Sequence, residues 1–140
     1  MLYMIFDLGG DGYALAANEV VEMLPFIVPK PVRGAPAQIA GSIGYRGRYL
    51  PLIDLARLEL GRPAERRMGT RIAVIAVPVD DRQLMIGLIL EQATEMLNCE
   101  PGAFRPFAQG PRGLVQRFDI QALLPSPLLQ AVALLPEAAP

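Results

Sequence analysis

The side chains that most often carry out catalysis are scarce in this chain. Its 140 residues include no histidine, which removes the usual general base, the commonest metal ligand and every Ser-His or Cys-His nucleophile. The serines are Ser42 and Ser126, and the single cysteine, Cys99, is by default a small reduced hydrophobic residue. No spacing rule selects two of the 14 aspartates and glutamates as an acid–base pair. We therefore predict no catalytic residue and no enzymatic activity.

Local ligand-binding motifs are missing as well. The sequence contains no G-x-x-x-x-G-K-[ST], no G-x-G-x-x-G after a strand and no C-x-x-C, so it has no local signature of a phosphate, dinucleotide or zinc site. The formal net charge of −1 and the isoelectric point of about 5.4 give no overall attraction to nucleic acid or anionic lipid. We predict no cofactor, no bound metal and no nucleic-acid partner.

The chain is unusually apolar for a protein without a membrane span. Hydrophobic residues make up 52% of it and the mean hydropathy is +0.32. The uncharged run over 120–135 is interrupted by Pro125 and Pro127 and is shorter than the roughly 18 residues that a membrane helix needs. The first residues lack a basic segment typical of secretory signals. We expect a cytoplasmic protein without direct membrane insertion, whose apolar residues form a large core or a surface for partners.

An internal repeat organises the sequence. The segment "YALAANEVVEML" over 13–24 aligns without a gap to "IGLILEQATEML" over 86–97, sharing a leucine and the triplet Glu-Met-Leu. The offset is 95 − 22 = 73 residues, about half of the chain. A chain of this length suits one domain. We therefore predict a single domain over residues 1–140, built of two related and closely packed β subdomains, with the second half beginning near residue 70.

Short strands dominate the predicted elements. Hairpins are expected over 2–16 around "GGDG", over 39–53 around Arg46-Gly47, and over 70–90 around residues 80–82, with a further extended segment over 20–28. In the third hairpin, apolar residues occupy both faces of the strand over 71–79, which indicates that both faces are covered. Asp54 is suited to N-cap a short helix that Gly61 ends. This pattern predicts an all-β fold of small barrels with short helices.

The second copy is shorter than the first. "RFDIQALLP" over 117–125 resembles "LIDLARLEL" over 52–60, with Asp119 over Asp54 at an offset of 119 − 54 = 65. The second copy has therefore lost 73 − 65 = 8 residues before Asp119, roughly one strand of 5–6 residues and a turn. We expect a shortened second barrel that lacks a strand, its gap filled by residues 102–113, by the tail around 128–135 or by a neighbouring molecule.

The segment "IAGSIGYRGRYLPLIDLARLELG" over 39–61 resembles the signature of CheW, the bacterial chemotaxis coupling protein family. The pattern G-x-x-x-x-RG-x-x-x-P-x-[IV]DL is filled by Gly41, Arg46-Gly47, Pro51 and residues 53–55. The resemblance extends from about Tyr3 to Leu124, and the family's usual acid after the penultimate strand is Glu91 here. It implies two SH3-like five-stranded β-barrel subdomains around a shared hydrophobic core.

The resemblance also implies a function. Such proteins are adaptors without catalysis that bind the cytoplasmic hairpin tip of a chemoreceptor and the regulatory domain of a CheA-type histidine kinase, and are recruited to membrane receptor arrays. We expect Arg46, beside Gly47, to contact a partner, and we place the kinase face near Tyr13, Leu15 and Val21.

Two other interpretations stay open at this point. One is a CheW-like scaffold of a surface-sensing or motility pathway other than chemotaxis. The other is an unrelated β-barrel enzyme or small-ligand carrier. Binding to a receptor and a kinase distinguishes the first two interpretations from the third.

Overall fold

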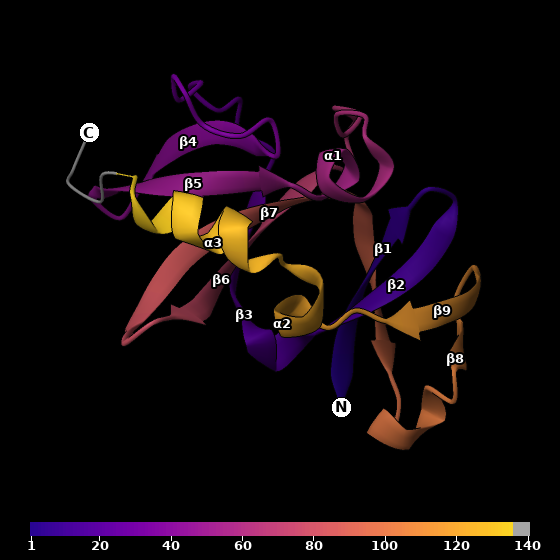
Figure 1. Ribbon diagram of the computed structural model, residues 1–140. Helices are drawn as coiled ribbons and strands as arrows, with labels where there is room; N and C mark the ends of the chain where they lie inside the picture. The colour runs from indigo at the N-terminus through magenta and orange to yellow at the C-terminus, as the bar shows by residue number, and fades with distance from the viewer. Residues whose placement is uncertain (136–140) are drawn as a thin grey trace.

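One long strand, β7 (Arg82–Asn98), joins two β units in the computed structural model, which describes residues 1–135 (Figure 1). The other strands within these residues are β1 (Leu2–Leu8), β2 (Asp11–Ala16), β3 (Val20–Pro25), β4 (Ile39–Tyr45), β5 (Arg48–Asp54), β6 (Arg71–Val79), β8 (Phe107–Gly110) and β9 (Gly113–Arg117). The helices are α1 (Leu55–Leu60), α2 (Ile120–Leu123) and α3 (Ser126–Ala133), with short 3-10 turns at Ala17–Glu19 and Pro101–Ala103. No helix within 1–135 is long and apolar enough to cross a membrane.

The two units have the same strand order. Unit I consists of β3, β6, the first half of β7, β5 and β4. Unit II consists of the second half of β7, β1, β2, β9 and β8. Each unit has a central hairpin, β6–β7 in unit I and β1–β2 in unit II. One edge of this hairpin pairs antiparallel with a single strand, β3 or the end of β7. The other edge pairs in parallel with a second hairpin, through β5 or β9.

The units do not coincide with the two halves of the sequence. The hairpin β1–β2 comes from the first repeat but lies in unit II, whereas the hairpin β6–β7 comes from the second repeat and lies in unit I. The third strand of each repeat therefore pairs with the hairpin of the other: β3 with β6, and the end of β7 with β1. The sequence boundary near residue 70 falls between α1 and β6. It divides the two repeats, but it does not divide the two units, because each unit contains strands from both sides of it.

The expectation that the second copy lacks a strand is wrong. β8 and β9 form a complete antiparallel hairpin, the counterpart of β4–β5. Of the 8 missing residues, 5 are lost before the hairpin: 15 positions separate Leu24 from Ile39, whereas 10 separate Leu97 from Phe107. The other 3 are lost within it: 9 positions separate Ile39 from Arg48, whereas 6 separate Phe107 from Gly113. A tighter connection and shorter strands absorb the whole difference, so unit II is shortened without losing a strand.

The predicted hairpins and the first helix are present. The Asp54 carboxylate accepts a hydrogen bond from the backbone N–H of Arg57, and Gly61 ends α1 with a φ of 73°. Asp119 caps α2 in the same way, accepting from the N–H groups of Gln121 and Ala122. β3 ends at Pro25 instead of continuing to residue 28, because proline offers no N–H to an extended ladder.

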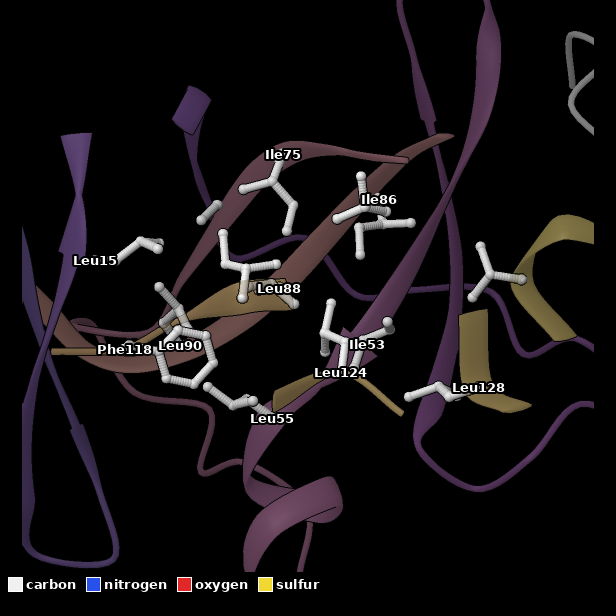
Figure 2. Close-up of a cluster of buried hydrophobic side chains, with 14 of the residues drawn as sticks. Leu15, Ile53, Leu55, Ile75, Ile86, Leu88, Leu90, Phe118, Leu124 and Leu128 are labelled. Carbon is white, nitrogen blue, oxygen red and sulfur yellow. The ribbon is translucent and has the colours of Figure 1, made fainter. Parts of the chain in front are cut away.

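One large apolar cluster, the main core, connects the units, and each unit has a smaller cluster of its own. Figure 2 shows Leu15 of unit II, Ile53 and Leu88 of unit I, and Phe118 pointing into one cluster, and all four are fully buried. β6 is buried on both faces through Ile72, Val74, Ile75 and Val77, as its sequence predicts. A core shared in this way makes folding of either unit alone unfavourable.

Residues 102–113 and the tail around 128–135, which were both expected to cover unit II, pack against different units. Phe104 packs edge-on against Tyr3 with ring centroids 5.0 Å apart, whereas Phe107 remains 43% exposed. The tail covers unit I instead: α3 inserts Leu128 and Val132 into the main core beside β6 and β7. The last five residues of the chain lie outside the described residues.

Candidate protein-interaction surface

The tight turn between β4 and β5 presents the Arg-Gly pair of the motif. Arg46 and Gly47 have φ values of 48° and 76°, so both central residues of the two-residue turn are left-handed, as type I′ hairpins require. A Cβ added at Gly47 meets no atom within 4 Å, so the backbone angle alone explains the glycine. The Arg46 side chain is 68% exposed. The turn thus places a cationic group in solvent on a rigid hairpin.

Glu22, the glutamate of the first repeat, fixes the direction of that arginine. Its Oε1 accepts hydrogen bonds from Arg46 Nη2 at 3.0 Å and from the Tyr45 hydroxyl at 2.6 Å. The guanidinium carbon of Arg46 also lies 5.1 Å from the centre of the Tyr45 ring. The hydrogen bond to Glu22, followed by burial, raises the pKa of Tyr45 above its ordinary value of 10.0. Glu22, Tyr45 and Arg46 therefore form one ordered polar cluster, which we call the β3–turn cluster.

The second repeat builds a similar contact from a different position of its turn. Arg112, in the turn between β8 and β9, places its Nε 2.7 Å from Oε1 of Glu95 and its Nη1 3.4 Å from Asp7. Glu95 is the repeat partner of Glu22, but the two turns differ by one position: Gly110 pairs with Gly113 as Tyr45 pairs with Arg48, so Arg112 is the second residue of its turn, where the first hairpin has Gly47. Sequence reasoning missed Arg112. Only a weak signal was available, because the two Arg-Gly pairs are 112 − 46 = 66 residues apart, one more than the offset of 65 between the capping aspartates, and so do not align.

The proposed kinase-face residues do not lie together. Val21 is 47% exposed at an irregularity of β3 and lines a surface hollow of about 340 Å³ with Val20, Ala76 and Ile120. Tyr13, on β2 of the other unit, is half-buried and stacks on Phe6.

Leu15 requires a correction. It is 0% exposed and belongs to the main core, while its neighbours Ala14 and Ala16 are buried in a second cluster on the other face of β2. Leu15 therefore has no surface with which to contact a partner.

A second polar network holds the loop after α1. Glu91 accepts two hydrogen bonds from the guanidinium of Arg62, at 3.0 and 3.1 Å, and one from the N–H of Glu65 at 2.7 Å. The Asp54 carboxylate, besides capping α1, accepts from the N–H of Ala64 at 2.9 Å. Burial opposes ionisation of Glu91, but the bonds from Arg62 and Glu65 outweigh it and lower the pKa of the carboxyl. These acids position backbone, and no cluster of metal-ligating side chains occurs within residues 1–135.

Comparison with known proteins agrees with this geometry. The profile of the CheW-like domain family matches residues 2–123. The chain is 29% identical over 108 residues to the chemotaxis protein CheW of Bacillus subtilis (strain 168), an alignment that covers 76% of this chain and 66% of that protein. The crystal structure of the scaffolding protein TtCheW from Thermoanaerobacter tengcongensis superposes with a TM-score of 0.73 at 18% identity, covering 85% of this chain and 84% of that one. The last match demonstrates the common fold, and the first spans most of the sequence. The chain therefore belongs to the CheW-like domain family.

Proposed function

We propose that this protein is an adaptor without catalytic activity, which couples the cytoplasmic tip of a chemoreceptor to the regulatory domain of a CheA-type histidine kinase. The observation that carries the proposal is the family match over residues 2–123. An adaptor that acts in the cytoplasm and is recruited to receptor arrays needs surfaces that remain available until a partner covers them. Partly exposed apolar side chains on β1, β3 and β7, such as Leu2, Val21 and Met96, are suited to that role.

We infer that units I and II correspond to the two SH3-like barrels of the family within one CheW-like domain. Their matching strand order supports this inference. Each unit has five strand segments, and a single shared core lies between the two.

The β3–turn cluster is our proposed receptor contact. Arg46 is exposed, its direction is fixed by Glu22, and its neighbour Tyr45 adds an amphipathic ring. Arginine and tyrosine are enriched among the residues that contribute most to binding in protein interfaces. We place the kinase face around Val21, where an exposed valine borders a hollow that has both apolar walls, from Val20, Ala76 and Ile120, and polar ones, from Asn18, Glu19 and Gln121.

Co-sedimentation tests the adaptor function. Membranes that contain a chemoreceptor are mixed with a CheA-type kinase, with and without this protein, and the kinase in the pellet is measured. The proposal expects the protein to sediment with the receptor and to increase the kinase in the pellet. If it binds neither protein, the proposal is wrong. If it couples only a receptor and kinase from a surface-sensing or motility system, the adaptor role stands and the pathway changes.

A further inference from the structure

Strands β5 and β7 diverge on one side of unit I. They pair in parallel only where Leu52–Asp54 meets Gly87–Ile89, so residues 48–51 and 82–86 have no ladder between them. Figure 1 shows α3 lying across the opening between β5 and the β6–β7 hairpin. Leu128 and Val132, one helical turn apart, are buried there. The carbonyl of Ala133 accepts a hydrogen bond from Arg82 at 3.0 Å. The opening is thus closed by a helix and not by a strand.

α3 leaves part of this opening unfilled. A hollow of about 250 Å³ remains between its C-terminal end and the strands, with Tyr49, Leu84, Met85 and Leu135 in its walls. A second hollow of about 210 Å³ adjoins it and shares Tyr49, Pro51 and Leu135. The two hollows lie side by side across these shared residues, and together we call them the α3 groove. The part of the chain that builds its α3 wall follows residue 123, where the family match ends.

The charges around the α3 groove have one sign. Arg46 and Arg48 stand at one end and Lys30 at the other. No carboxylate from residues 1–135 lines either hollow, although the chain has 14 acidic residues. Glu22 partly neutralises Arg46, whereas Arg48 and Lys30 have no ion-pair partner within 1–135. An apolar floor between unpaired cations attracts a segment with apolar anchors and negative flanks.

We propose that the α3 groove docks an acidic amphipathic helix of a partner protein. α3 itself shows that the opening accepts a helix through two aliphatic side chains spaced i, i+4, and helices bind grooves through such anchors. An added strand fits less well, since Pro51 has no N–H to donate and Val132 and Leu135 stand beside β5. The α3 groove borders the proposed receptor contact, since Tyr45 and Arg46 line its first hollow, but the inference is tested separately because its unpaired cations, Arg48 and Lys30, and its apolar wall at Met85 take no part in the receptor and kinase proposal.

Selection from a phage-displayed library of helical peptides, about 16 residues long so that each forms several turns, tests the occupant. The bait is the full-length protein, and binders to a Met85→Asp variant are removed. We expect enriched peptides to share aliphatic residues at i, i+4 and flanking Asp or Glu. Absence of enrichment, or enrichment of basic peptides, would overturn the proposal.

The best peptide is then measured by fluorescence anisotropy. We expect Met85→Asp and Arg48→Glu each to weaken binding about tenfold or more, and a version of the peptide with Lys in place of its acids to bind better to Arg48→Glu than to the wild type. Met68→Ser, at a 94% exposed residue outside the groove, is the control and should bind normally. Equal binding to all variants overturns the proposal, as does sedimentation showing that the groove instead joins two copies of the chain.

Discussion

Arg112 Nε lies 2.7 Å from the carboxylate of Glu95, and this pair repeats the contact between Arg46 and Glu22 at 3.0 Å. In both copies an arginine from the turn of the second hairpin reaches the glutamate of the Glu-Met-Leu strand. The glutamate of the triplet thus has the same kind of partner in both repeats, since each glutamate orients an arginine of its own repeat. Only Arg46 has an adjacent tyrosine that shares its glutamate, whereas Arg112 is held by a second acid, Asp7. The same contact thus gives a more exposed arginine in unit I than in unit II, at 68% against 42%.

Replacing Arg46 with alanine is expected to weaken receptor coupling without unfolding the protein. An exposed ion pair contributes about 0–1 kcal/mol to stability, whereas truncation of an interface arginine often costs ~2 kcal/mol of binding. Chemical denaturation and co-sedimentation with receptor membranes measure the two effects on one preparation. Arg112→Ala removes the arginine that pairs with the glutamate of the other repeat and is the matched control. Normal coupling by Arg46→Ala, or equal loss in both variants, would show that the first turn has no special role.

Val21 and Leu15 should respond oppositely to substitution. Val21→Asp places a charge on a half-exposed residue, so we expect the protein to fold and its kinase binding to fall. Leu15→Ala removes a fully buried side chain from the shared core and should destabilise the protein by about 2–5 kcal/mol. Thermal unfolding and kinase pull-down distinguish the effects. A folded Val21→Asp variant that binds the kinase normally would move the kinase face elsewhere.

Gly41, the first residue of the CheW signature, is expected to tolerate no side chain. Its φ is 145°, and an added Cβ would lie 2.3 Å from the carbonyl oxygen of Lys30, on the segment that bridges to Ser42. We expect Gly41→Ala to lower the free energy of unfolding by about 3 kcal/mol or more, because backbone must move to relieve the overlap. Gly34→Ala is the control: its φ is 82° but the space around it is open, so about 1–2 kcal/mol is expected. Similar losses in both variants would contradict the role of the Lys30 contact.

The contribution of Glu91 to stability should depend on pH. Hydrogen bonds from Arg62 and the Glu65 N–H hold the pKa of the Glu91 carboxyl below its ordinary value of 4.5. A lowered folded-state pKa stabilises the protein above the unfolded-state pKa, and this contribution is lost as pH falls through the folded-state pKa. We expect Glu91→Gln to lower the free energy of unfolding by about 1 kcal/mol at pH 7. This is less than charge-assisted hydrogen bonds usually contribute, because Arg62 is partly exposed to solvent. The difference from the wild type should shrink below about pH 4.5. Urea titrations across pH measure it, and a difference that grows on acidification would contradict the assignment.

The sequence predicted local features better than strand partners. Hairpins, the cap at Asp54 and the double burial of β6 follow from turn residues and apolar pattern, and all were confirmed. The motif around Arg46-Gly47 predicted the family, and the profile match over residues 2–123 confirmed it. The burial of Leu15 was not predictable, since alternation in a strand distinguishes two faces but does not show that both are covered.

The β8–β9 hairpin was missed because its strands have only four and five residues, in a segment that is rich in proline and glycine. The strand exchange was missed for a different reason: a repeat shows which segments are alike, whereas pairing depends on which of two similar hairpins each third strand meets.

The exchange predicts how the chain behaves when it is cut. Each half of the sequence keeps its hairpins but lacks a further partner for some of its strands, because β3 pairs with β6 and β1 pairs with the end of β7. Fragments 1–68 and 69–140, separated beside the fully solvated Met68, should therefore each be unfolded alone, since neither can bury the apolar faces of its strands. Mixed in equal amounts, they should assemble and recover native-like chemical shifts, because the shared core then becomes complete. Circular dichroism and two-dimensional NMR of each fragment and of the mixture measure this. A folded fragment 1–68, with β1, β2 and β3 paired among themselves, would show that the exchange is not required for folding.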